Sequence, residues 1–230
     1  MSNGLQKIYS EIPDHYERIN HILTLGLDIF CRRRTARMAA AEGGKMWLDV
    51  CCGTGEMAVN LRRLMQNGTR LYAADFSLPM VVRAMAKEEL KGIDFVITEA
   101  GFLPFADNTF DLITISFATR NINSNREKLI ERFGEFRRVL KPDGRFVNLE
   151  TSQPRWGLTR ALMHLYVRST VKQIGTLISG SKAGYGYLAG TIPRFYRPEE
   201  LADILKEAGF STVTFKRLFF GIAATHRAVK

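Results

Sequence analysis

The sequence predicts an α/β fold in which a doubly wound, mostly parallel seven-stranded sheet ends in an antiparallel hairpin. From Lys45 onward, short apolar runs alternate with amphipathic helical patterns, which is typical of parallel strands joined by crossover helices. At the end of the chain, two apolar runs, Thr212–Phe219 and Ile222–His226, flank a turn at Gly221 and indicate the hairpin. The 230 residues, 46% of them hydrophobic, suffice for one sizeable domain with a buried core.

The predicted elements follow in regular order. The first five strands are expected in short apolar runs, at Met46–Cys51, Leu71–Ala74, Asp94–Ile97, Phe110–Phe117 and Arg145–Glu150. Helices are expected where apolar residues gather on one side of a helical repeat, at Glu56–Gln66, Pro79–Leu90, Arg126–Leu140 and Glu199–Ala208. Ser77 is a suitable N-cap for the second helix, and Gly209 ends the last one.

Two regions stand outside this alternation. The segment up to about Ala41 has a helical pattern, and Arg155–Phe195 is helical and then rich in Gly and Tyr. Ligands of a doubly wound sheet bind at the carboxyl ends of the strands, near the topological switch point. We therefore expect residues 1–230 to form a single domain, with 1–41 as a helical lid over that edge and 155–195 as a substrate-side helical insertion.

Charge and cysteine content narrow the function classes. The net charge of +10 is compatible with nucleic acid, an anionic membrane surface or an anionic ligand, but equally with a solvated basic surface. The three cysteines, Cys31, Cys51 and Cys52, have no metal-ligand spacing, so no metal site is predicted, and their sparse, odd number suggests a reducing compartment. Neither a signal peptide nor a membrane span is evident, so a cytoplasmic protein with at most peripheral contact at the inner face of the membrane is expected.

The loop that follows the first expected strand has the pattern of a nucleotide site. Asp49 to Glu56 reads DVCCGTGE, and Gly53, Gly55 and Ala58 fit GxGxxA at a strand–turn–helix junction. Asp75 lies 20 residues after Gly55, near the spacing of a carboxylate that binds ribose hydroxyls, and Phe76 beside it is assigned to the same site. NAD and S-adenosylmethionine both carry such a ribose, so this pattern leaves the cofactor open.

Charge favours one of these two cofactors. A dinucleotide places its pyrophosphate at the N-terminus of the first helix, where Glu56 stands with Asp49 nearby, and two carboxylates would repel it. S-adenosylmethionine instead carries an ammonium and a sulfonium. The alternative is that Glu56 only complements the helix dipole. A second element, Glu99–Ala100 after the third strand, is expected to read the adenine edge through its backbone, although a surface turn explains it equally well.

Four runs resemble the ubiquinone/menaquinone biosynthesis C-methyltransferase family, and most of all its demethylmenaquinone members. They are DVCCGTGE, LPFADNTFDLITISFATRNI, RVLKPDGRFVNLETSQP and the ending AGF…GIAATHR, and together they extend over nearly the whole chain. The resemblance implies a class I, Rossmann-like methyltransferase fold that uses S-adenosylmethionine to methylate a ring carbon of a prenylated quinol, here demethylmenaquinol. By motif match, the cofactor would contact Thr54, Asp75, Glu99, Ala100 and Ser116, in addition to the loop residues Asp49, Gly53 and Gly55 and to Phe76.

The resemblance also implies substrate-side residues. Arg120 and Asn121 match the family's Arg–Asn pair, Tyr16 begins an element beside the active site, and Tyr185–Leu188 resembles a substrate-side stretch. Arg120 would stabilise the quinol oxyanion, or form a salt bridge to the N-terminal lid instead. Asn121 would orient the same oxygen or cap the following turn. Tyr16 would pack against the ring or simply belong to the core.

The expected partners are a prenylated quinol lipid and, transiently, a membrane surface, which suits the positive net charge. The apolar segment Trp156–Ile178 would contact the isoprenoid tail, or pack on the core or at a homodimer interface. Alternatives are a methyltransferase of the same fold acting on another small molecule or on RNA, and a non-catalytic protein that binds the cofactor. No appended RNA-binding motif is present, so nucleic acid is not an expected partner.

Overall fold

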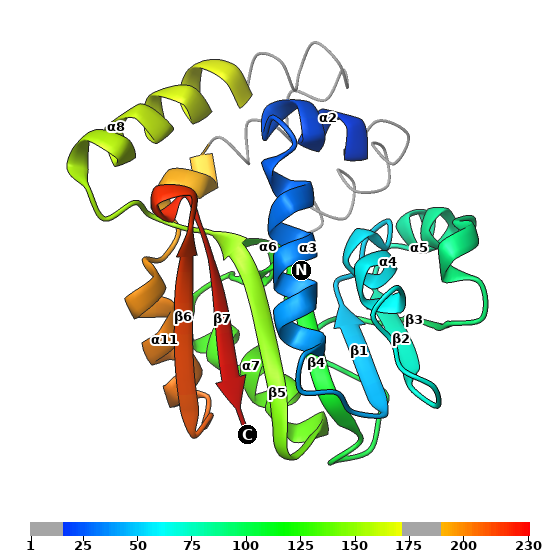
Figure 1. Ribbon diagram of the computed structural model, residues 1–230. Helices are drawn as coiled ribbons and strands as arrows, with labels where there is room; N and C mark the ends of the chain where they lie inside the picture. Colours follow the sequence, from blue (N-terminus) through cyan, green and yellow to red (C-terminus); the bar gives the residue numbers. More distant parts are fainter. Residues whose placement is uncertain (1–15, 172–189) are drawn as a thin grey trace.

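The strands form one mixed sheet in the order β3-β2-β1-β4-β5-β7-β6 (Figure 1). The computed structural model describes residues 16–171 and 190–230. The strands are Met46–Val50 (β1), Arg70–Asp75 (β2), Asp94–Ile97 (β3), Phe110–Ser116 (β4), Leu140–Thr151 (β5), Thr212–Leu218 (β6) and Ala223–Val229 (β7). The first five pair in parallel, and β7 runs antiparallel to both β5 and β6. The predicted parallel sheet with its C-terminal hairpin is confirmed.

Helices cover both faces of the sheet (Figure 1). They are Tyr16–Leu23 (α2), Leu27–Ala40 (α3), Glu56–Arg62 (α4), Leu78–Met85 (α5), Thr119–Ile122 (α6), Arg126–Val139 (α7), Gly157–Tyr166 (α8) and Pro198–Glu207 (α11). One core joins the sheet to α7 and α11, with Phe133 and Leu205 among its buried residues. The other joins it to α3, α4 and α5 through residues such as Met57 and Ala84. This two-sided burial explains why the central strands are apolar throughout.

Several predicted boundaries are wrong. The helix expected over Glu56–Gln66 ends at Arg62, and the strand expected over Ile222–His226 continues to Val229. The helix expected over Pro79–Leu90 ends at Met85, and a short 3₁₀ turn follows at Glu88–Leu90. The break lets Leu90 turn inward, where its side chain is fully buried and packs directly behind Gly55. The fifth strand begins at Leu140 rather than Arg145, because Leu140 already pairs with Phe110 before the register shifts.

The chain order places a topological switch point beside β1. From β1 the chain proceeds outward through β2 to β3, and it then returns to the other side of β1 as β4. The connections that leave the carboxyl ends of β1 and β4 therefore diverge to opposite sides. Such a divergence leaves a crevice where doubly wound sheets bind ligands.

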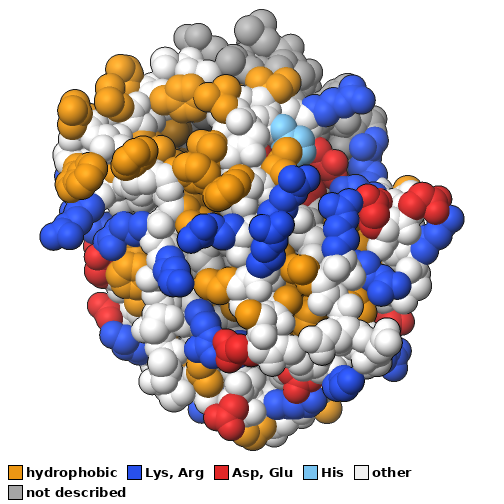
Figure 2. Space-filling model, in the orientation of Figure 1, with side chains coloured by type: hydrophobic (Ala, Val, Ile, Leu, Met, Phe, Trp, Pro, Cys, Tyr) orange, Lys and Arg blue, Asp and Glu red, His pale blue; other side chains and the backbone are white. Residues whose placement is uncertain are grey.

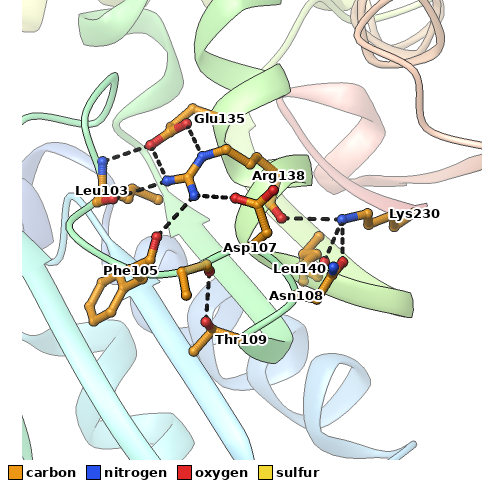
Figure 3. A network of polar contacts seen from close by, with 10 residues as sticks. Leu103, Phe105, Asp107, Asn108, Thr109, Glu135, Arg138, Leu140 and Lys230 are labelled. Carbon is orange, nitrogen blue, oxygen red and sulfur yellow. Dashed lines mark hydrogen bonds and ion pairs between the residues drawn. The ribbon is translucent and has the colours of Figure 1, made fainter.

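A polar network fixes the loop that precedes β4 (Figure 3). Arg138 on α7 donates to the backbone carbonyls of Leu103 and Phe105, to the carboxylate of Asp107 at 2.6 Å, and to both oxygens of Glu135. Glu135 in turn accepts a hydrogen bond from the backbone N–H of Leu103 at 2.8 Å. One guanidinium thus uses its planar fork to hold three points of a loop that lacks regular structure.

The two regions outside the alternation are helical where the structure describes them. Residues 16–40 form α2 and α3, and the insertion begins with α8 and a π-helical turn at Val167–Val171. The hydroxyl of Tyr166 donates to the carbonyl of Leu23 at 2.9 Å, so α8 is tied to the end of α2. The Tyr185–Leu188 stretch and residues 1–15 lie outside the described residues, and the lid and insertion roles stay predictions.

The core on the α7 side yields a stability prediction. Phe133 is fully buried against Phe136 and Phe146, so truncating it removes apolar burial and leaves a cavity. We expect Phe133→Ala to lower the free energy of unfolding by about 3–5 kcal/mol in urea titrations. The matched control is Phe102→Ala, because Phe102 is 80% exposed, and it should change that free energy by about 0.5 kcal/mol or less. Equal effects of the two substitutions would contradict the assigned core.

Candidate functional site

A pocket of about 600 Å³, counted out to its open mouth, lies at the carboxyl ends of β1, β2 and β4. The lining residues come from the loop after β1, the end of β2, the turn after β4, and helices α3, α4 and α5: Arg32, Cys51, Cys52, Gly53, Thr54, Glu56, Met57, Asp75, Phe76, Met80, Ser116, Phe117, Ala118, Asn121 and Ile122. A cavity therefore lies at the switch point, as the sequence predicted.

The loop after β1 forms one wall through an unusual backbone path. Cys51, Gly53 and Gly55 all have positive φ angles, of 54°, 55° and 82°. Gly55 is the N-cap of α4, and a Cβ there would lie 2.5 Å from the Leu90 side chain and 3.1 Å from Ala84. Gly55 therefore lets α4 pack closely on its neighbours and does not line the pocket, whereas Gly53 and Thr54 do.

Asp75 connects this loop to the end of β2. One carboxylate oxygen accepts the Gly53 N–H at 2.8 Å and the other accepts the Ser77 N–H at 2.9 Å. Burial raises the pKa of Asp75, and these backbone hydrogen bonds oppose the rise. A carboxylate offers about four acceptor positions. Asp75 can therefore hold the loop and still accept hydrogen bonds from a ligand in the pocket.

Asp49 has a different place from the one predicted. It lies beneath the loop and is 1% exposed, and it does not line the pocket. One carboxylate oxygen accepts from the Thr114 hydroxyl at 2.7 Å, and the other has no partner. Burial raises the pKa of Asp49 to about 7. Asp49 is thus a buried support of the loop and contributes little full negative charge to the pocket below neutral pH.

Glu56 does line the pocket, but a cation balances its charge. Arg32 on α3 places Nη1 at 3.1 Å from one Glu56 oxygen and at 2.7 Å from Asp28. His21 contacts the same two carboxylates through its two ring nitrogens, at 2.9 Å from Asp28 and 3.2 Å from Glu56. The carboxylates therefore favour a cationic cofactor less strongly than the sequence suggested, because Arg32 offsets Glu56 and Asp49 lies beneath the loop.

His21, Asp28 and Glu56 also come close enough together to share a metal ion. Sequence spacing did not reveal this group, because its members come from three helices. A guanidinium nitrogen of Arg32 already contacts both carboxylates. The prediction of no metal site stays untested.

The two members of the predicted Arg–Asn pair point to different places. Asn121 lines the pocket, whereas Arg120 is 6% exposed and lies against β5. Its backbone N–H donates to Glu150 at 3.0 Å, and its Nη1 contacts the Glu150 carboxylate at 3.5 Å and the Thr151 hydroxyl at 3.1 Å. The salt bridge of Arg120 is thus formed with β5, and not with the lid in the part of the chain that is described.

Of the remaining predicted residues, some line the pocket and others do not. Ser116 and Phe76 line the pocket. Glu99 and Ala100 lie in the loop after β3 and are not among the lining residues, so their contact with a cofactor stays a prediction. Tyr16 begins α2, but its side chain lies outside the described part of the structure.

Comparison with known proteins bears on the chemistry of this pocket. The model of the ubiE/COQ5 methyltransferase family matches residues 1–230. The chain belongs to this family. A demethylmenaquinone methyltransferase of Thermus thermophilus is 37% identical over 95% of this chain and 98% of that protein. A ubiquinone/menaquinone biosynthesis C-methyltransferase of Desulfotalea psychrophila is 33% identical over 99% of this chain and 90% of that protein.

Solved structures agree on the fold of this methyltransferase. A possible histamine N-methyltransferase of Thermotoga maritima superimposes with a TM-score of 0.61 at 18% identity, covering 94% of this chain and 98% of that one. Human N-acetylserotonin methyltransferase, solved in complex with S-adenosylmethionine, gives 0.62 at 19% identity, covering 94% of this chain and 57% of that one. These structures confirm the predicted class I fold, and the family match confirms the predicted methyltransferase activity.

The thiols of the two loop cysteines favour their neutral form in this methyltransferase. Cys51 and Cys52 line the pocket, but burial raises the pKa of both thiols well above their ordinary value, and the charges of Asp75 and Asp49 add to the rise. A neutral thiol is a poor nucleophile. The two residues therefore act as small packing groups, in agreement with the sequence interpretation.

The most informative residue that sequence reasoning missed is Arg32. It stands in the run Arg32–Arg34, of which Arg33 and Arg34 are exposed while Arg32 is buried. The available signal was its spacing of four residues from Asp28, which places a carboxylate on the same side of the helix. Phe117, Met57 and Met80 are further lining residues that no motif indicated.

The raised pKa of Asp49 predicts a pH-dependent stability. The folded-state pKa of about 7 exceeds the ordinary 3.8, so folding takes up a proton between about pH 4 and 7. The stability that protonated Asp49 contributes is fully present below about pH 4 and is lost as the pH rises to about 7. Asp49→Asn keeps an acceptor for Thr114 but cannot ionise. In urea titrations, the stability of this variant relative to the parent protein should rise by at least about 1 kcal/mol between pH 5 and 8. A difference that stays constant with pH would contradict the assignment.

Proposed function

We propose that this methyltransferase transfers a methyl group from S-adenosylmethionine to a ring carbon of a prenylated quinol, converting demethylmenaquinol to menaquinol. One observation carries the proposal. A pocket lined by the loop after β1 and by Asp75 lies at the switch point of a chain whose relatives are named demethylmenaquinone methyltransferases. Because this fold supports many activities, the assignment of the substrate depends on these relatives. The assignment of the cofactor depends on the relatives and on the pocket together.

The pocket residues fit the proposed cofactor. The ribose would be held by Asp75, because a carboxylate has acceptor positions beyond those that its backbone hydrogen bonds use. The apolar side chains of Phe76 and Met80, in the wall beside Asp75, would cover the purine. Gly53 and Thr54 would contact the part of the cofactor that lies along the loop, and Ser116 closes the wall at the end of β4.

In this reaction the main tasks of the protein are to position the two reactants and to stabilise the charge that develops. When bound, S-adenosylmethionine supplies an electrophilic methyl group on a sulfonium. The ring carbon becomes a good nucleophile when a neighbouring quinol hydroxyl loses its proton, so the protein must favour negative charge on that oxygen. Asn121 lines the pocket and would orient the oxygen, while Arg120, held by Glu150, would supply positive charge behind it.

Product analysis tests the proposal. The protein is incubated with methyl-labelled S-adenosylmethionine and a panel of demethylated quinols, other small phenols and bulk RNA, and the products are identified by mass spectrometry. Labelled menaquinol is the expected product. Label in RNA or in another small molecule would select a different methyltransferase, and tight cofactor binding without any turnover would indicate a non-catalytic protein.

Arg120 can be tested separately from cofactor binding. We expect Arg120→Ala to lower kcat by about tenfold or more, because the positive charge behind the developing oxyanion is lost. The dissociation constant for S-adenosylmethionine should change by about twofold or less. The variant Arg120→Lys keeps a positive charge opposite Glu150 and controls for loss of folding. Unaltered turnover of folded Arg120→Ala would refute the role.

A lipid substrate requires a route from the membrane. We propose a cytoplasmic protein that docks transiently on the inner face of an anionic bilayer through an α8 surface, which consists of exposed apolar side chains: Leu25, Phe30, Trp156, Leu158, Leu162, Leu165 and Phe220. Leu158, Leu162 and Leu165 follow a helical spacing along one side of α8. No helix of the described residues is long and apolar enough to cross a bilayer.

Contacts join these side chains into one surface. The rings of Phe30 and Phe219 are in contact, with centroids 5.4 Å apart, and Phe220 is the next residue. The turn at Gly221 packs against Pro154 and Arg155, in the segment that precedes α8. Figure 2 shows the apolar patch in the upper left, with Lys and Arg side chains along its lower border.

Charge favours an anionic membrane as the occupant of this surface. From Thr151 to Pro198 the sequence has seven Lys or Arg residues and no Asp or Glu. Basic residues near a bilayer that contains anionic lipids contribute about 1 kcal/mol each to binding. A homodimer is the alternative occupant.

We expect Leu158→Glu/Leu162→Glu to weaken binding to vesicles that contain phosphatidylglycerol by at least about tenfold, because apolar burial is lost and negative charge is introduced. Phe102→Glu, in the exposed loop after β3, is the control and should bind as the parent protein does. Cosedimentation measures binding. Unchanged binding of the double variant would contradict membrane docking, and a shift from dimer to monomer in sedimentation velocity would assign the surface to a homodimer instead.

A further inference from the structure

Arg32 is the only lysine or arginine among the residues that line the pocket in the described structure. Its side chain is 8% exposed, and its guanidinium lies over the Phe117 ring at 4.9 Å from the centroid. Phe117 follows β4 directly, so Arg32 extends from α3 toward the carboxyl edge of the sheet. A buried charge is unfavourable unless it is paired and hydrogen-bonded, so the partners of Arg32 matter.

The partners of Arg32 are unevenly distributed over the guanidinium. Nη1 contacts both Asp28, at 2.7 Å, and Glu56, at 3.1 Å. Nε is buried and has no hydrogen-bond partner. A buried N–H without a partner is unfavourable by about 1–3 kcal/mol, and more for a charged group. A guanidinium has five N–H donors, and both carboxylate contacts use Nη1, so donors remain for an anionic ligand group while the bonds to Asp28 and Glu56 stay in place.

Asp28 holds Arg32 in this position. It also accepts from the Thr24 hydroxyl at 2.6 Å and contacts a ring nitrogen of His21 at 2.9 Å. Burial by itself would raise the pKa of Asp28, but the Thr24 hydrogen bond and the charge of Arg32 outweigh it and lower the pKa. An ionised Asp28 fixes the guanidinium beside Glu56, so the pocket wall presents a positive and a negative group side by side.

A free amino acid end has the complementary pair of charges. We infer that Arg32 binds the α-carboxylate of the methionine part of S-adenosylmethionine, and that Glu56 faces its ammonium. The inference rests on the proposed function for the identity of the cofactor. It also gives Glu56, the acidic residue at the N-terminus of α4, a partner in the cofactor.

Binding measurements with two ligands test the role. S-adenosylhomocysteine carries the amino acid end, and 5′-methylthioadenosine shares its adenosine but lacks that end. We expect Arg32→Gln to weaken S-adenosylhomocysteine binding by about 10- to 100-fold, as for a lost charge-assisted hydrogen bond, and to change methylthioadenosine binding by about twofold or less, as measured by isothermal titration. Arg33→Gln, an exposed neighbour on the same helix, should leave both dissociation constants unchanged.

The outcomes separate this inference from the proposed function. If the parent protein binds neither ligand, the proposed cofactor is wrong. If the parent protein binds both and Arg32→Gln weakens both equally, or neither, the carboxylate role is wrong and Arg32 serves only to join α3 to α4. If Arg32→Gln does not fold, Arg32→Lys is measured in its place. Weaker binding of S-adenosylhomocysteine alone supports the role, and an equal change in the dissociation constants of both ligands, or no change in either, overturns it.

Discussion

The hydrogen bonds that Asp75 accepts hold the site together. Its carboxylate joins the loop after β1, through the Gly53 N–H, to the start of the segment that leads into α5, through the Ser77 N–H. Both connections leave the same edge of the sheet because β1 and β2 are parallel. The bridge anchors the positive-φ path of the loop, together with the hydrogen bond that the Cys52 N–H donates to the Ala74 carbonyl at 3.0 Å. One buried carboxylate thus helps to hold two backbone turns of the pocket in place.

The N-terminal helices complete the pocket from the other side. Arg32 on α3 reaches Glu56 at the first turn of α4, and Glu17 on α2 receives a hydrogen bond from Lys87, which follows α5. These contacts are partly or fully buried, so solvent and salt screen them less than surface pairs. The segment that precedes the sheet in sequence thus forms part of the pocket wall, and charge pairing holds it there.

The sequence predicted the parts of this structure that depend on local pattern. The strands were found because apolar runs reflect burial on both faces, and the loop was found because Gly53 and Gly55 occupy positive-φ positions. The end of α5 was missed because it depends on Leu90 packing behind Gly55, a contact that no local pattern records. The opposite orientations of Arg120 and Asn121, and the pairing of Arg32 with Glu56, arise from contacts between distant segments and could not be predicted from neighbouring residues.

The central claim is that the pocket between the loop after β1 and the turn after β4 holds the methyl donor. A crystal structure of the complex with S-adenosylhomocysteine tests it most directly. The account predicts that the ribose hydroxyls bond to Asp75, while the Asp75 hydrogen bonds to Gly53 and Ser77 remain in place. A ligand bound away from Asp75, or a loop that must release Asp75 to admit the ligand, would contradict the account.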